Sequence, residues 1–198
     1  MTTEATATAP AKSQNKEVKS KRAPLLLTLE QFRRRYSNRE DAYKYEFNNG
    51  VIEKSPSQTK VKQFHIVDNL TEAFRKTSAF QHGARLATEI EQLTSAVQLR
   101  RPDLAYLTRA KIQQDDESVS DFVIEIISPT DSYLKVSKKL REYFKAGVKV
   151  VWQIVPEEQT VYVYTSPTKV TICEGGTVCS AAPVVSDFTI AAKDIFVK

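Results

Sequence analysis

The feature that most constrains this chain is a glutamate inside an apolar segment, Glu125 in DFVIEIISPT (residues 121–130). The side chains around it are large and apolar, and they predict a short strand that is covered on both faces and ends at a Ser-Pro turn. Removing an unpaired carboxylate from water costs several kcal/mol even after the protein relaxes. The surrounding fold must therefore supply a reason for a carboxylate at this position.

The chain of 198 residues is long enough for one domain with a core, together with a tail. Residues 1–23 contain almost no large apolar side chain and predict a disordered basic tail, which leaves residues 24–198 as the domain. Five basic and two acidic residues give the tail +3 of the net charge of +5, so the domain carries only +2. Such a tail is typical either of contact with a polyanion or of a solubilising extension.

The apolar segments and the cysteines of the chain indicate its cellular compartment. No apolar run approaches the roughly 20 residues that cross a bilayer, and the N-terminus has no continuous apolar segment typical of a secretory signal. The two cysteines, Cys173 and Cys179, flank a Gly-Gly turn without the further ligands of a metal site. We therefore predict two reduced thiols in a cytoplasmic protein with no membrane partner.

Turn signals and hydrophobic periodicity predict a mixed α/β (α+β) domain with a central mixed sheet, flanking helices and extra β-hairpins. Thr28 and Gln31 resemble a capping box at the start of a short helix, and Asn49-Gly50 predicts a hairpin turn. One predicted helix starts at Thr28, and two others cover residues 62–77 and 135–146. Predicted strands cover residues 43–47 and 51–54, and further strands are predicted in RLATEIEQL, VQLRRPDLAYL, the segment around Glu125, KVVWQIV, TVYVYT and KVTICEGGTVCS.

Asp103, in the segment RRPDLAYL, provides one explanation for Glu125. The preceding proline fixes a turn or a strand start, so the aspartate leads into an apolar strand. Two carboxylates from neighbouring strands repel each other unless a cation lies between them, and Mg²⁺ prefers such oxygen ligands. The alternatives are that Asp103 is a turn residue, and that Glu125 pairs with an arginine such as Arg101 or faces outward from an edge strand.

The order of several motifs resembles the Uma-two family, described as nucleases of the restriction-endonuclease-like PD-(D/E)xK superfamily. These motifs are YEFNNGVIEKSPS, a following helix with His65, RRPDLAYL, VIEIISPTD and KLREYFKAGVKVVWQIVP. The resemblance runs from about residue 25 to the closing DFTIAAKDIF, which is nearly the whole domain. It implies a restriction-endonuclease-like mixed sheet flanked by helices and a site for Mg²⁺, with Mn²⁺ as a substitute.

The resemblance also implies roles for individual residues. Asp103 matches the motif aspartate and Glu125 the motif acid, while Ile126 would offer its backbone carbonyl to the metal. Glu46 matches an acidic position that would join the site or hold a metal-bound water, although a hairpin glutamate is also commonly a surface residue.

The family motif places a lysine two residues after the acid, where this chain has Ile127. The resemblance suggests that the lysine has moved to the next helix, and helix geometry at about 100° per residue distinguishes the candidates. Lys138 points away from the apolar face, and Lys135 lies further round than Lys139. Lys139 lies on the flank of that face, where its stem can follow the core and its ammonium can reach the end of the sheet. A surface lysine with a partly buried stem is the alternative interpretation.

Together these features predict a Mg²⁺-dependent endonuclease that hydrolyses DNA with a metal-activated water. Glu46, Asp103, Glu125 and Lys139 are its predicted catalytic residues, and Asp103, Glu125 and Ile126 its predicted metal ligands. A silent nuclease fold that binds nucleic acid or protein is the alternative, favoured by the displaced lysine and the modest charge. The oligomeric state stays open, although nucleases of this superfamily often act as homodimers to cut both strands.

Overall fold

The structure is a computed structural model that describes residues 26–56 and 61–198, so the predicted tail 1–23 lies outside the described residues. Its strands are β1 (Tyr43–Asn48), β2 (Val51–Pro56), β3 (Arg85–Thr88), β4 (Gln92–Ser95), β5 (Gln98–Arg100), β6 (Leu104–Leu107), β7 (Phe122–Ile126), β8 (Val150–Val155), β9 (Thr160–Ser166), β10 (Lys169–Cys173), β11 (Val178–Ala181) and β12 (Val185–Ala191). Its helices are α1 (Leu29–Phe32), which continues as the π-helix η1 (Arg33–Ser37), α2 (Val61–Arg75), α3 (Ser78–Gln81), α4 (Arg109–Gln113), α5 (Tyr133–Ala146) and α6 (Ala192–Ile195).

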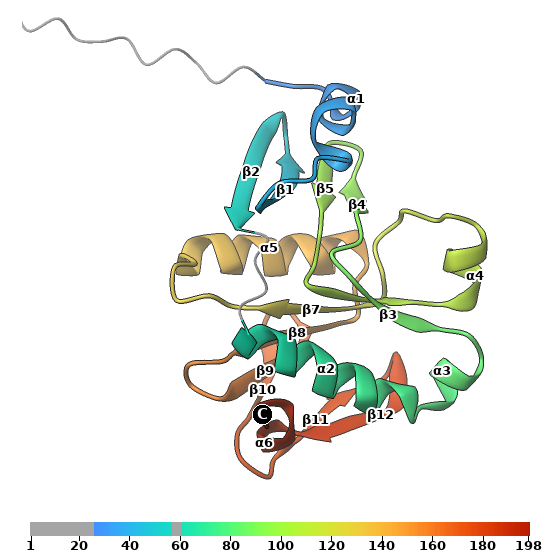
Figure 1. The fold of residues 1–198 in the computed structure, drawn as a ribbon, viewed down its shortest axis with the longest axis vertical. Helices are drawn as coiled ribbons and strands as arrows, with labels where there is room; N and C mark the ends of the chain where they lie inside the picture. Colours follow the sequence, from blue (N-terminus) through green and yellow to red (C-terminus); the bar gives the residue numbers. More distant parts are fainter. Residues whose placement is uncertain (1–25, 57–60) are drawn as a thin grey trace, which may run out of the picture.

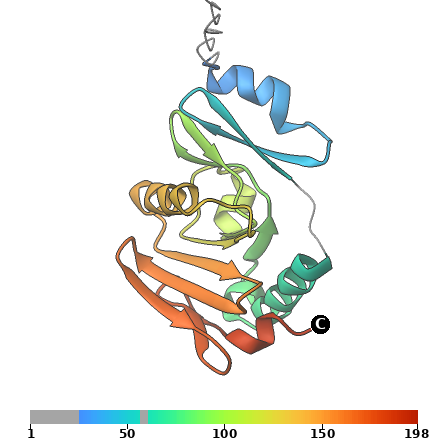
Figure 2. The same ribbon diagram turned by 90° about the vertical axis from the view of Figure 1, so that its left-hand side faces the viewer.

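A six-stranded sheet in the order β10-β9-β8-β7-β6-β3 forms the centre of the molecule. The pair β7–β8 is parallel, and α5 connects its two strands; the other pairs in this sheet are antiparallel. Figures 1 and 2 show α5 on one face of the sheet, and α2 with α6 and the two-stranded sheet β11–β12 on the other. The mixed sheet flanked by helices is the architecture that the sequence predicts.

The alternation of side chains along β7 divides its residues between the two faces. Phe122, Ile124 and Ile126 join the larger core, to which α2 and β12 contribute. Val123 joins the second core, where it packs with Leu140 of α5. Because side chains of a strand alternate with period two, Glu125 lies on the same face as Val123 and is directed toward α5.

Helix α5 has well-defined ends that fix its position over this face. The Ser132 side chain accepts a hydrogen bond from the backbone N–H of Lys135, which caps the first turn. Gly147 ends the helix with φ 109°, a left-handed conformation that favours glycine. The sequence predicts this end, and it predicts the start at residue 135, two residues later than observed.

A second sheet of four strands, in the order β2-β1-β5-β4, lies beside α5 at the upper end of Figure 1. The predicted turn Asn49-Gly50 joins β1 to β2, and both residues have positive φ, as this turn requires. The predicted capping box of Thr28 and Gln31 is present at the start of α1. Phe32 of α1 packs against Tyr45 and Phe47, so the opposite face of β1, with Lys44 and Glu46, is turned toward α5.

The segment from residue 85 to residue 107 differs from the sequence prediction. Two strands were expected there, but each is divided in two, so that β3 and β6 join the large sheet while β4 and β5 join the small one. The chain leaves the first sheet at Glu89, which has φ 49°, and returns to it after Pro102, which has no N–H for a strand ladder. Periodicity does not reveal a change of sheet, because the alternation of side chains continues on both sides of the break.

Both cysteines are buried and free in the structure. The described helices include none that is both long and apolar enough to cross a membrane.

Candidate active site

Asp103 immediately precedes β6, and Glu125 lies on the adjacent strand β7, on the same face of the large sheet. In the pairing of β6 with β7, Leu104 lies opposite Ile124, so the next position along places Asp103 opposite Glu125. In the pairing of β7 with β8, Glu125 lies beside Gln153. The three polar residues therefore form a row across three neighbouring strands, under α5.

The two oxygens of Asp103 have different partners. Oδ2 accepts a hydrogen bond of 2.7 Å from the backbone N–H of Ile126, the residue that follows Glu125. Oδ1 lies 2.8 Å from the ammonium nitrogen of Lys44, which extends from β1 and is 8% exposed. Burial opposes the charge on Lys44, but Asp103, Glu125 and Glu46 outweigh it and raise the pKa of this lysine. A backbone hydrogen bond and an ion pair thus fix Asp103 beside Glu125.

Glu125 is 8% exposed and contacts two groups from α5 through the same oxygen. The hydroxyl of Tyr143 donates to Oε1 at 2.5 Å, and the ammonium of Lys139 lies 2.8 Å from it. Burial raises the pKa of Glu125, and the negative charge of Asp103 adds to this, although Lys139 acts in the opposite direction. The same burial, with Glu125 nearby, raises the pKa of Tyr143 well above its usual value, so the phenol remains a donor.

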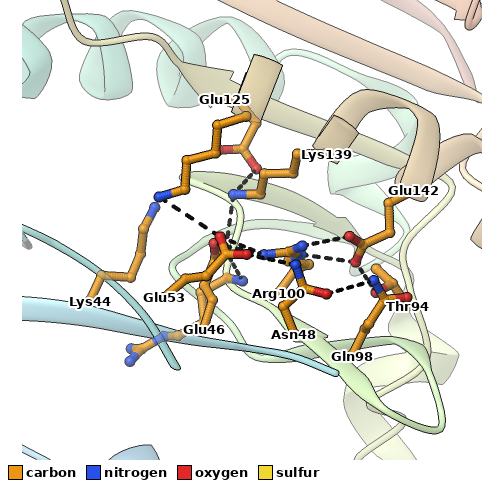
Figure 3. A network of polar contacts seen from close by, with 12 residues as sticks. Lys44, Glu46, Asn48, Glu53, Thr94, Gln98, Arg100, Glu125, Lys139 and Glu142 are labelled. Carbon is orange, nitrogen blue, oxygen red and sulfur yellow. Dashed lines mark hydrogen bonds and ion pairs between the residues drawn. The ribbon is translucent and has the colours of Figure 1, made fainter. Parts of the chain in front are cut away.

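Lys139 bridges the two sheets at this point, as Figure 3 shows. Its Nζ atom lies 2.9 Å from Glu46 of β1 as well as 2.8 Å from Glu125 of β7. Burial would lower the pKa of Lys139, but the two glutamates outweigh it and raise that pKa, so the side chain is an ammonium. Lys138 is exposed, and Lys135 lies 3.8 Å from Glu53 at the rim. Of the three lysines, the structure brings Lys139 to the acids.

Glu46 contacts the ammonium of Lys139, which lies between Glu46 and Glu125. Its Oε1 atom accepts a hydrogen bond of 2.8 Å from the backbone N–H of Arg101, and its Oε2 atom lies 3.5 Å from Arg100. Burial alone would raise the pKa of Glu46, but Lys139, Lys44 and Arg100 outweigh it and lower the pKa to about 2. Glu46 is therefore an anion near neutral pH, and its contacts go to positive or donor groups.

Arg100 organises the acidic side chains around Glu46. Glu46 and Glu53 lie directly opposite each other on β1 and β2, an arrangement that is destabilising for like charges. The guanidinium of Arg100, on β5, lies 3.1 Å from Glu53 and forms a bidentate pair with Glu142 of α5, at 2.8 and 2.5 Å. Figure 3 shows this arginine between the three glutamates. Arg100 thus joins the small sheet to α5 below the predicted site.

The paired acids open onto a cleft of about 810 Å³ between the two sheets. Asp103, Glu125, Lys139 and Gln153 line it, together with the Ser128-Pro129 turn that follows β7. Among the described residues, no three His, Cys, Asp or Glu side chains are arranged to hold a metal ion together. The cleft offers two neighbouring carboxylates as hard oxygen ligands, from Asp103 and Glu125.

Sequence reasoning selects Glu46, Asp103, Glu125 and Lys139, and the structure brings all four to one cleft. The sequence does not indicate the roles of Lys44 and Arg100, or the contact of Tyr143 with Glu125. One signal for Lys44 was available: YKYEFN alternates, so Lys44 and Glu46 share the face opposite the aromatic side chains. The contact of Glu125 with Arg101, one of the alternatives, is not formed within the described residues, since Arg101 instead contacts Glu89.

Comparison with known proteins supplies the family. Solved structures that match include a crystal structure from Anabaena variabilis described as "a putative nuclease belonging to DUF820", with a TM-score of 0.71 and 24% sequence identity over 86% of this chain and 97% of that chain. That likeness shows the fold. No curated protein matches the chain. The family model Uma2, described as "Putative restriction endonuclease", matches residues 29–193. With that match over most of its length, the chain belongs to the Uma2 family of restriction-endonuclease-like nucleases.

Proposed function

We propose that this protein is a Mg²⁺-dependent endonuclease that hydrolyses phosphodiester bonds in DNA. The observation that carries the proposal is the placement of the Asp103 and Glu125 carboxylates on adjacent strands of one face, with the ammonium of Lys139 2.8 Å from Glu125. The restriction-endonuclease description of its family supports DNA as the substrate.

The residues of the cleft fit a divalent cation. Four cations lie against five carboxylates, and an additional cation would balance the remaining negative charge: Lys44, Arg100, Lys139 and Lys135 at the rim against Glu46, Glu53, Asp103, Glu125 and Glu142. Mg²⁺ is commonly held by one or two carboxylates with several waters. Asp103, Glu125 and the backbone carbonyl of Ile126 would hold it here. When bound, such an ion polarises a phosphoryl oxygen and lowers the pKa of a coordinated water.

The side chains around the acids would have distinct tasks. Tyr143 and the backbone N–H of Ile126 fix the orientation of the Glu125 and Asp103 carboxylates. Lys139, as an ammonium at the edge of the cleft, would orient the attacking water or stabilise the charge that develops on the phosphate. Glu46 holds Lys139 from the opposite side, so its role would be to position the lysine.

The test is a cleavage assay on supercoiled plasmid, linear DNA and RNA, with Mg²⁺, Mn²⁺ or EDTA. We expect cleavage of DNA with either metal, none in EDTA, and none by Asp103→Ala or Glu125→Gln. Exposed Asp115→Asn, on the turn after α4, is the matched control and should cleave normally. Cleavage that continues in EDTA, or in Asp103→Ala, would contradict the proposal.

One contact favours the alternative of a silent fold that binds nucleic acid. The ammonium of Lys44, 2.8 Å from Asp103, takes one of the oxygens that a metal would need. Titration calorimetry with Mn²⁺ separates the two functions: a nuclease binds the ion and loses it in Asp103→Ala, whereas a silent fold binds none. Lys44→Met should then tighten metal binding if the lysine competes with the ion.

A further inference from the structure

Gln153 is a largely buried residue whose carboxamide reaches the cleft, and no hydrogen bond joins that carboxamide to another described residue. It is 8% exposed and lies beside Glu125 in the parallel pairing of β7 with β8. Val151, two residues before it, packs in the core under α5, so Gln153 lies on that same face. Among the described residues, the fully enclosed polar side-chain atoms without a partner belong to Arg33 and Glu91, so the Gln153 carboxamide is open to the cleft that it lines.

Gln92 provides the contrast of a glutamine whose amide is enclosed by the protein. Gln92 is 1% exposed, and its carboxamide donates to the Ser120 hydroxyl at 2.6 Å and accepts from the Ser120 N–H at 3.2 Å. The polar neighbours of Gln153 in the row are likewise engaged, since Asp103 and Glu125 each have partners from the backbone or from α5. A carboxamide that is open to a cleft and has no partner among the described residues is available for contact with a ligand.

The chemistry of the cleft narrows the kind of ligand. Carboxylates line the cleft, among them those of Glu46, Asp103 and Glu125, so a phosphate there needs donor groups that are not already held by these acids. The ammonium groups of Lys44 and Lys139 are held on those carboxylates. A carboxamide has two N–H donors and no charge, so it can bind a phosphate oxygen without attracting the neighbouring acids into a new ion pair. A strand separation of about 4.8 Å puts it within reach of a phosphate held beside Glu125.

We infer that Gln153 is a substrate-contacting residue whose carboxamide donates to a phosphate oxygen of the nucleic-acid strand beside the Asp103–Glu125 pair. This inference rests on the proposed function for the nature of the ligand. It adds a contact on β8, on the side of Glu125 opposite Asp103. The row across β6, β7 and β8 would thus combine two acids that hold the metal with one side chain that donates a hydrogen bond to the phosphate.

The test compares Gln153→Met, which keeps the length of the side chain without its donors, with Gln113→Met on the exposed face of α4. Affinity for a fluorescent DNA oligonucleotide is measured by anisotropy in Ca²⁺ and in EDTA, and the melting temperature is measured alongside. A hydrogen bond to a charged group corresponds to roughly a ten- to hundredfold change in Kd, which is the loss that we expect for Gln153→Met. Gln113→Met should bind as the unmodified protein does.

The melting temperature separates a ligand contact from a structural role. An unpaired amide contributes no internal hydrogen bond, so Gln153→Met should melt at the same temperature or higher; a marked decrease would overturn the inference. Unchanged affinity of Gln153→Met, in a protein that cleaves DNA, would overturn it while the proposed function stands. Weakened affinity without any cleavage by the unmodified protein would support the contact and contradict the nuclease. A protein that binds no nucleic acid overturns both.

Discussion

Replacing Lys139 by alanine removes a cation that contacts two buried carboxylates, Glu46 and Glu125. Its ammonium lies 2.8 Å from Glu125 and 2.9 Å from Glu46, and its side chain is only 17% exposed. Breaking a buried ion pair commonly costs about 3–5 kcal/mol. Glu46 keeps Arg100, and Glu125 keeps the Tyr143 hydroxyl, so we expect the lower end, about 3 kcal/mol at pH 8. For a domain of this size, that corresponds to a decrease of roughly 6–12 °C in Tm.

The loss of stability should depend on pH in a defined direction. Burial already raises the pKa of Glu125, and removing Lys139 raises it further. A carboxyl group whose pKa is raised by folding contributes stability at low pH that is lost as pH rises through its folded pKa. The difference in unfolding free energy between Lys139→Ala and the unmodified protein should therefore increase from pH 5 to pH 8. Urea denaturation across this range measures it.

The activity of the same variant tests the catalytic role. An electrostatic contact that is made mainly in the transition state is commonly worth about 10²–10³ in rate, so kcat should decrease by that factor at a temperature where the variant is folded. Lys138→Ala is the matched control: its side chain is exposed on the same helix, and both its stability and its kcat should change little. Equal losses for the two variants, or a pH-independent stability difference, would refute the reasoning.

Three further outcomes are expected. Tyr143→Phe removes the hydrogen bond to Glu125, and the loss of this donor raises the pKa of the Glu125 carboxyl. The acid limb of the profile of cleavage rate against pH should therefore move to higher pH, and an unchanged limb would contradict the assigned contact. Arg100→Met removes the ion-pair partner of Glu142 and one of the cations beside Glu46 and Glu53, and it should cost about 3–5 kcal/mol in urea denaturation. Glu142→Gln should restore part of this loss, and no recovery in the double variant would argue against the coupling. The pKa of Glu46 is lowered from its ordinary value of 4.5 to about 2, so the stability that it contributes is present above pH 4.5 and is lost as pH falls toward 2. Glu46→Gln should flatten this part of the profile of stability against pH. An equally steep profile in the variant would show that other groups cause the pH dependence.

The sequence predicts the candidate site better than it predicts the connections between the strands. Glu125 attracts attention because it interrupts an apolar strand, and Lys139 because helix geometry places it on the flank of the apolar face; both inferences need only local periodicity. Lys44 and Arg100 are harder to find, because their contacts depend on the tertiary fold: Lys44 reaches Asp103 across the two sheets, and Arg100 joins the small sheet to Glu142 of α5. The break at Pro102 also depends on which sheet the next strand joins, and periodicity carries no information about that choice.

The contribution of both sheets to one cleft has a consequence for how the protein is made. Lys44 and Asp103, which meet in the cleft, are 59 positions apart in the chain, and α5 must be synthesised before Glu46 and Glu125 receive their shared lysine. Contacts between distant parts of a chain form late in folding, because the loops between them must close first. A growing chain on the ribosome therefore carries the separate acids but not the assembled cleft. We expect catalytic competence to arise only after α5 has left the exit tunnel and both sheets have docked.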